Sequence, residues 1–165
     1  MTRTLPRLSK TLLVAAVAFY YTLVVFNNLT DYDSNYQFVR HVLMMDSTFP
    51  GNHGMWRALN SPAIHTAFYI GIITWEFLTT LFCWYAALRL ALALHHHAES
   101  FARARAIASA ALAFGMLQWF VAFLSVGGEW FLMWQSHSWN GQDAAFRMFT
   151  SLGIVLVIVA LPEPA

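Results

Sequence analysis

The sequence predicts an all-α membrane protein, a bundle of four transmembrane helices. Of its 165 residues, 59% are apolar and only 10% are charged, whereas a soluble domain carries roughly 25% charged residues. Four apolar runs are each long enough to cross a bilayer core of ~30 Å, which takes about 20 helical residues. Basic residues also gather on one side of these runs more than on the other, as they do in multi-pass proteins.

The four predicted spans cover residues 8–29, 63–94, 104–134 and 141–161, and an outer loop covers residues 30–62. We expect one domain over residues 1–165, since no internal repeat is visible. The first span is expected to be a retained helix rather than a cleaved signal, because no small-x-small cleavage site follows its apolar core.

Two spans have marked starting points. In the stretch NSPA, Ser61 is the expected N-cap of the second span, and Pro62 takes the first helical position, where the missing N–H costs nothing. In the stretch NGQD, Asn140 is the expected N-cap of the fourth span. Asp143 is then placed to complement the helix dipole.

The outer loop carries a helix signal of its own. Ser34 and Gln37 form a possible capping box. Apolar residues then recur on one helical face, which predicts a short helix lying in the membrane interface. These residues are Tyr36, Val39, Val42 and Leu43.

The orientation follows from the basic residues, of which six lie on one predicted side and three on the other. The six are Arg3, Arg7, Lys10, Arg89, Arg103 and Arg105, and the three are Arg40, Arg57 and Arg147. Cytoplasmic loops of membrane proteins carry the excess of Lys and Arg. We therefore expect both termini in the cytoplasm.

Each span carries small or polar residues on one face. Such stripes face neighbouring helices rather than lipid, because they allow close approach and interhelical hydrogen bonds. The stripes are Thr11, Ala15, Ala18 and Thr22 in the first span; His65, Tyr69, Glu76, Thr80 and Cys83 in the second; Gly115, Gln118, Ala122, Ser125 and Glu129 in the third; and Arg147 with Ser151, and Thr150 with Gly153, in the fourth.

Two opposite charges, Glu129 and Arg147, are expected at similar depth in the third and fourth spans. A charge at membrane depth costs ~2.5–3.5 kcal/mol unless it pairs or reaches water. The sequence therefore predicts a structural ion pair between Glu129 and Arg147, with a functional role for Glu129 as the alternative.

Glu76 has no obvious partner, because it lies deep in the second span. Burial away from water favours the neutral form of an unpaired carboxyl, and ionisable residues inside a membrane are functional candidates. Two interpretations stay open. Glu76 is either a structural acid bonded to Gln118 or Tyr69, or a functional group, with Gln118 and His65 as further candidates.

Metal and haem sites are weakly indicated. His65 with Glu76, Glu129 and either His41 or His137 could form a metal site, but no pair of these residues has helical ligand spacing. A b-type haem needs axial ligands from facing helices, and His65 is the one histidine expected inside the membrane. The single cysteine, Cys83, is expected to be a buried apolar residue, so no cofactor is expected.

Four stretches of the chain are distinctive. They are NNLTDYDSNYQFVRHVLMMDSTFPGN, WRALNSPAIH, WEFLT and GGEWFLMWQSHSWNGQDAAFR. Together they resemble a bacterial family of predicted small integral membrane proteins, a family of unknown function. The resemblance covers nearly the whole chain and implies four membrane helices in the bacterial inner membrane. It implies no activity, cofactor or catalytic residue.

Two classes of function remain. The first is a non-catalytic accessory or scaffold subunit of a larger membrane complex, such as a respiratory one. The second is a small transporter or ion- or metal-handling protein that uses intramembrane carboxylates, which would need a homo-oligomer to enclose a path. The expected partners are the lipid bilayer and either other membrane subunits or further copies of the chain. Nucleic acid is not an expected partner, because no basic cluster is present, and we expect no enzymatic activity.

Overall fold

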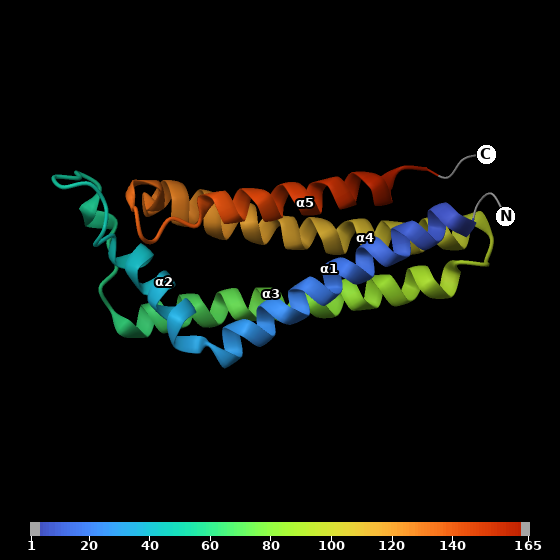
Figure 1. The fold of residues 1–165 in the computed structure, drawn as a ribbon, viewed down its shortest axis with the longest axis horizontal. Helices are drawn as coiled ribbons and strands as arrows, with labels where there is room; N and C mark the ends of the chain where they lie inside the picture. The colour runs from blue at the N-terminus through green and yellow to red at the C-terminus, as the bar shows by residue number, and fades with distance from the viewer. Residues whose placement is uncertain (1–3, 163–165) are drawn as a thin grey trace.

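The structure is a computed structural model that describes residues 4–162, and across these residues the chain is helical (Figure 1). The long helices are α1 (Thr4–Thr30), α3 (Pro62–Ala93), α4 (Ala98–Leu117) with its continuation η2 (Gln118–Trp130), and α5 (Gln142–Ala160). Each of these four is long and apolar enough to cross a membrane. The all-α fold class and the number of membrane spans are therefore confirmed, but the third span covers Ala98–Trp130 rather than residues 104–134.

The predicted starts of α3 and α5 hold to within one residue. Ser61 has an extended backbone and precedes Pro62, which takes the first helical position. α5 begins after Gly141 rather than after Asn140. The Asn140 side-chain oxygen still accepts a hydrogen bond of 3.1 Å from the backbone N–H of Gln142, so it satisfies one of the free donors at this helix end.

The segment η2 is a π-helix that continues α4 without a break. Its wider turns are visible in two bonds that each span five residues. The backbone N–H of Phe131 donates to the Val126 carbonyl (3.0 Å), and the Ser125 hydroxyl donates to the Phe120 carbonyl (2.9 Å). π-Helices are rare and are often found at functional sites.

The predicted burial of the small and polar stripe in the third span is wrong within η2. Gly115 and Gln118 are buried as predicted, but Ala122 and Ser125 are half-buried and Glu129 is exposed. The buried residues of η2 are Gln118, Trp119, Gly127 and Gly128. The prediction assumed 3.6 residues per turn, and a π-helix has more, so the buried face drifts away from the extrapolated positions.

The outer loop contains α2 (Tyr32–Met44), as predicted, but without the predicted capping box. α2 begins after Asp31, so Ser34 lies inside the first turn and makes no capping bond to the backbone. The predicted apolar face is buried. This face packs against apolar residues of α3, η2 and the loop that follows η2. The packing removes apolar surface of both partners from water.

The long helices form a ring in which α1 packs on α3, α3 on α4, α4 on α5, and α5 on α1. The start of α1 and the end of α5 lie at one end of the bundle, beside the turn at residues 94–97, and we call this the terminal end (Figure 1). The opposite end, which we call the α2 end, carries α2 and the short helices η1 (Met55–Arg57) and η3 (Met133–Gln135).

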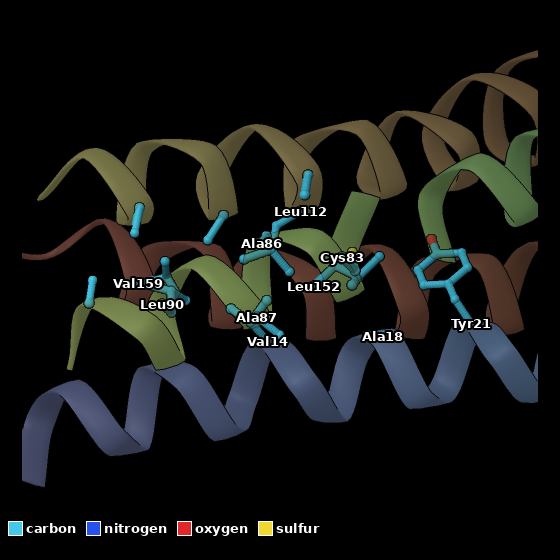
Figure 2. Close-up of a cluster of buried hydrophobic side chains, with 14 of the residues drawn as sticks. Val14, Ala18, Tyr21, Cys83, Ala86, Ala87, Leu90, Leu112, Leu152 and Val159 are labelled. Atoms are coloured by element: carbon cyan, nitrogen blue, oxygen red, sulfur yellow. The ribbon is translucent and has the colours of Figure 1, made fainter. Parts of the chain in front are cut away.

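The core of the terminal half is closely packed, and its small side chains bring the helices together (Figure 2). Ala18 of α1, Ala86 of α3 and Ala108 of α4 are each 0% exposed. Small residues at helix contacts let the backbones approach closely, which is how helices associate in membranes. Val14 and Leu112, also 0% exposed, fill the space between them.

Three basic side chains close the helix ends at the terminal end. Arg7 donates to the carbonyls of Leu94 (3.0 Å) and His96 (2.7 Å), at the end of α3. Lys10 and Arg105 both donate to the carbonyl of Leu161, which follows α5. The final carbonyls of a helix lack backbone donors and carry partial negative charge, so these cations stabilise both ends.

The predicted stripes of the first and fourth spans need correction. In α1, Thr22 is exposed, and the buried face runs through Tyr21, Val25 and Asn28 instead. In α5, Arg147, Thr150 and Ser151 are all exposed. The buried residues of α5 are Ala145, Leu152 and Val159. They are seven positions apart and apolar, so they pack on α4 at less cost than the polar side chains would.

Candidate functional site

Glu76 lies near the middle of α3, about 21 Å along the helix from Pro62 at 1.5 Å per residue. Its side chain is only 2% exposed. The sequence predicts this placement, because Glu76 shares one helical face with four other residues that are all buried. They are His65, Tyr69, Thr80 and Cys83.

Two amide side chains hold the Glu76 carboxyl group. The Asn28 side chain of α1 donates to Oε2 (2.6 Å), and the Gln118 side chain, at the start of η2, donates to Oε1 (3.1 Å). The Tyr69 hydroxyl donates to the backbone carbonyl of Asn28 (3.0 Å) and lies 3.2 Å from its side-chain oxygen. We call Glu76, Asn28, Gln118 and Tyr69 the Glu76 cluster.

The Glu76 cluster has more hydrogen-bond acceptors than donors can satisfy, and none of its four residues is a cation. In the described part of the chain, the groups that act on the Glu76 charge are the Asn28 and Gln118 amides, and no basic side chain is among them. The titratable groups within its electrostatic reach are Tyr20 and Tyr21 of α1 and Tyr69 of α3. A carboxylate here would therefore be a buried negative charge without a counter-ion.

One buried acceptor beside Glu76 has no donor. Gln118 is 0% exposed, and its side-chain oxygen makes no hydrogen bond within the described residues. A buried polar atom without a partner costs about 1–3 kcal/mol. Such atoms are uncommon in native proteins and call for an explanation.

A second layer of bonds positions Gln118. The indole N–H of Trp119 donates to the Tyr21 hydroxyl (2.9 Å), which itself donates to the backbone carbonyl of Gly115 (3.0 Å). Gly115 leaves the room that this contact needs, because a Cβ atom there would lie 2.9 Å from the Tyr21 oxygen. The start of η2 is thereby fixed to α1.

A cavity of about 280 Å³ connects Glu76 with the surface of the α2 end. Its inner wall contains Glu76, Asn28 and Tyr69, and its outer part contains Asn27 and Asn35. Asn27 is exposed and Asn35 is half-buried. The buried carboxyl group and the more exposed asparagines therefore line the same cavity, together with apolar residues.

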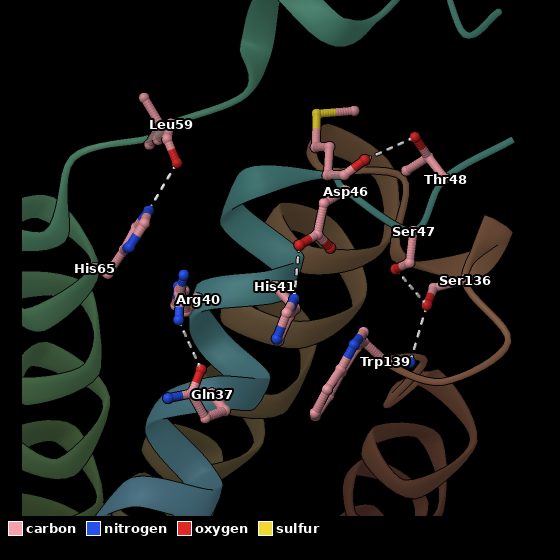
Figure 3. Close-up of polar contacts among 11 residues, drawn as sticks. Gln37, Arg40, His41, Asp46, Ser47, Thr48, Leu59, His65, Ser136 and Trp139 are labelled. Atoms are coloured by element: carbon pink, nitrogen blue, oxygen red, sulfur yellow. Dashed lines mark hydrogen bonds and ion pairs between the residues drawn. The ribbon is translucent and has the colours of Figure 1, made fainter. Parts of the chain in front are cut away.

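His65 does not join this site. It lies one turn into α3, eleven residues before Glu76, and its Nε2 donates to the Leu59 carbonyl (2.7 Å; Figure 3). The bond ties the outer loop to α3. Within residues 4–162, no group of three or more His, Cys, Asp or Glu side chains could hold a metal ion. The predicted metal ligands His65, Glu76 and Glu129 are thus not brought together.

The other two candidate histidines also lie apart from Glu76. His41 of α2 contacts the Asp46 carboxylate (2.7 Å) and stacks on Trp139, with ring centroids 4.5 Å apart (Figure 3). His137 is exposed. Nearby, the hydroxyls of Ser47 and Ser136 are hydrogen-bonded (2.7 Å), so these contacts join the outer loop to the turn before α5.

The predicted ion pair between Glu129 and Arg147 is not formed in the part of the chain that the structure describes. Both side chains are exposed, and the ion pairs found among the described residues are His41–Asp46 and Arg103–Glu99. The π-helical turns of η2 move Glu129 away from the face assumed for an α-helix.

Asn28 makes the shortest hydrogen bond to Glu76, but it is not among the site residues predicted from the sequence. The spacing of residues along α1 could have indicated it, because buried residues lie alternately four and three positions apart. They include Arg7, Thr11, Val14, Ala18, Tyr21, Val25 and Asn28. Such spacing marks a helix contact face, and Asn28 lies at its end.

Comparisons with known proteins agree with a membrane protein. No curated protein and no solved structure matches the chain. Residues 6–162 match the model of a family described as "Predicted small integral membrane protein (DUF2165)". This match covers nearly the whole chain, and the four long apolar helices fit its description. The chain therefore belongs to the DUF2165 family of small integral membrane proteins.

Proposed function

We propose that this protein holds a proton or a small monovalent cation on Glu76 inside the membrane, and that it acts as a non-catalytic accessory protein rather than as an enzyme. The observation that carries this proposal is the Glu76 carboxyl group, 2% exposed and bonded to two uncharged amides. Amide donors lower the energy of a carboxylate but leave its charge in place. A proton or a cation removes that charge.

The energies favour a site that can exchange its proton or cation. A carboxylate at membrane depth costs ~2.5–3.5 kcal/mol. Each hydrogen bond to a charged group contributes about 1.5–3 kcal/mol, and Glu76 accepts two. Because these terms are of similar size, neither the charged nor the neutral form is strongly excluded. A change in the surroundings can therefore switch one into the other.

Access to Glu76 is proposed from the α2 end. The cavity beside Glu76 is lined by Asn27 and Asn35 at that end. On the other side of Glu76, towards the terminal end, Cys83, Ala86 and Leu90 of α3 are each 0% exposed in the packed core (Figure 2). This arrangement supports a binding site with access from one side, not a path through a single copy of the chain.

The accessory role, in a complex such as a respiratory one, is supported by the surface of the bundle. Only 17% of the apolar span of α5 is buried within the chain, against 28–33% for the other three. The free face suits lipid or another membrane helix. Purification from native membranes in mild detergent separates two cases. Stoichiometric foreign subunits support the accessory role, and a lone homo-oligomer supports ion handling by several copies.

We further propose that the protein resides in the bacterial inner membrane with both termini in the cytoplasm. The predicted topology assigns six basic residues to one side of the membrane and three to the other, and the positive-inside rule assigns the richer side to the cytoplasm. The cavity beside Glu76 would then open to the outer face.

Infrared difference spectroscopy tests the Glu76 proposal directly. Wild-type protein and Glu76→Gln are compared in lipid, and the C=O stretch of the protonated carboxyl is followed from about pH 5 to about pH 9. A band missing from Glu76→Gln should disappear as the pH rises or as Na⁺ or K⁺ is added. Glu129→Gln is the matched control, because Glu129 is exposed. Identical spectra of wild type and Glu76→Gln under all conditions would refute the proposal.

A further inference from the structure

We propose that the Glu76 cavity and an adjoining apolar cavity form one binding site for a hydrophobic organic cation. The ammonium group would lie at Glu76, and the apolar part would fill the second cavity. This inference rests on the function proposed above, because it requires Glu76 to take up a positive charge, and it names the class of molecule that carries the charge.

The two cavities share part of their walls. The apolar cavity has a volume of about 200 Å³ and lies between α2, α3 and η2. Its lining has four residues in common with the Glu76 cavity of about 280 Å³: Phe38, Val39, Ile72 and Phe123. The two cavities therefore adjoin, and the proposed ligand would occupy both by extending past these four side chains.

The polar part of this site offers acceptors to a donor-rich cation. An alkylammonium group carries three N–H donors. The Glu76 carboxyl is part of the cavity lining and supplies two oxygens, and the side-chain oxygen of Asn28 and the hydroxyl of Tyr69 belong to the same lining. The charges are complementary, because no basic side chain of the described residues neutralises Glu76.

The apolar cavity excludes a simple inorganic ion as its occupant. All of its lining residues are aliphatic, aromatic, methionine or glycine. Phe68 and Val121 on its rim are 40% and 39% exposed. The cavity thus opens on the outer surface of α3 and η2, so a hydrophobic molecule could enter from the bilayer.

The π-helix shapes one wall of this site. Val121, Ala122, Val126 and Gly127 of η2 line the apolar cavity. Aromatic walls also suit an organic cation, since ring faces attract positive charge. The π-helical segment η2 therefore forms part of the wall of the apolar cavity.

Calorimetric titration of the purified full chain in non-ionic detergent tests the ligand class. The probe is 2-phenylethylammonium, and its uncharged analogue 2-phenylethanol is the reference ligand. The wild type should bind the ammonium at least about tenfold more tightly than the alcohol. Glu76→Gln should bind the two alike, and Glu129→Gln should behave as wild type. Equal affinity of the wild type for both probes, as expected for a cavity that holds lipid chains, would overturn the inference.

A second variant separates this inference from the Glu76 proposal. Ala122→Leu places three extra carbons in the apolar cavity without touching Glu76, and Val126→Phe serves the same purpose if the first variant does not fold. Either should weaken 2-phenylethylammonium binding about tenfold or more and leave the infrared response of Glu76 unchanged. If the infrared response exists but the ammonium preference does not, the inference fails and the Glu76 proposal stands. If the infrared response is absent, both fail.

Discussion

Gly115 offers a sharp test of how the Glu76 cluster is held in place. Its backbone carbonyl accepts the Tyr21 hydroxyl, which in turn accepts the Trp119 indole N–H. In Gly115→Ala, the new Cβ would lie 2.9 Å from the Tyr21 oxygen and 3.1 Å from a methyl carbon of Thr79. Both neighbours sit in the packed core, so the methyl group cannot be accommodated without movement.

The expected loss follows from three contributions. Alanine favours a helix over glycine by ~1 kcal/mol. An extra methyl group in a packed core costs about 1–3 kcal/mol. If Tyr21 turns away, the two hydrogen bonds on its hydroxyl are lost as well, at about 0.5–1.5 kcal/mol each. If Tyr21 turns away, Gly115→Ala should therefore lower the free energy of unfolding by about 1–5 kcal/mol, and if Tyr21 stays in place, by up to about 2 kcal/mol.

The measurement is unfolding of the detergent-solubilised protein by a denaturing detergent, followed by circular dichroism. Gly71→Ala is the matched control. Gly71 lies on α3 with nothing within 4 Å of an added Cβ, so this variant should be as stable as wild type or more stable by up to about 1 kcal/mol. Adding Tyr21→Phe to Gly115→Ala should cost less than the two separate losses together. Equal stability of Gly115→Ala and Gly71→Ala would refute the packing argument.

Three further predictions concern other parts of the chain. Arg7→Gln should lower the free energy of unfolding by about 1.5–3 kcal/mol, because charged hydrogen bonds to the end of α3 are lost. The control Arg103→Gln removes an exposed i,i+4 ion pair and should change the free energy of unfolding by less than about 0.5 kcal/mol. The same detergent titration measures both variants, and similar losses would contradict the capping role of Arg7. Cys83 is 0% exposed and should resist a membrane-permeant maleimide until the protein is unfolded; mass spectrometry that finds rapid labelling of the folded protein would show an open core. A reporter that works only in the cytoplasm should be active after Pro162 and silent near Asn52, and the reverse pattern would invert the proposed orientation.

Much of the fold could be predicted because it depends on local properties of the sequence. Length and hydropathy alone decide whether a helix can span a bilayer, and the four spans follow from them. Pro62 marks the start of α3 for a purely local reason, its missing N–H. The buried face of α3 was also predictable, since a polar residue such as Glu76 in a regular helix turns away from lipid.

The candidate site was only partly predictable, because its contacts depend on how the helices are rotated about their axes. The sequence indicated Glu76 and Gln118 as neighbours, but gave no reason to bring Asn28 of α1 to the same point. It favoured a pair between Glu129 and Arg147, which the structure leaves exposed. That prediction extended a 3.6-residue period through η2, where the chain is π-helical.

The sequence by itself therefore determined the membrane class, the number of spans and the burial of Glu76, because each follows from hydropathy and helix geometry within one segment. The tertiary structure alone decided the partners of Glu76, the cavity beside it and the exposure of Glu129. These features arise where different helices meet. A change of helical period at Gln118 alters which side chains face inward, and no pattern within a single span reveals that change.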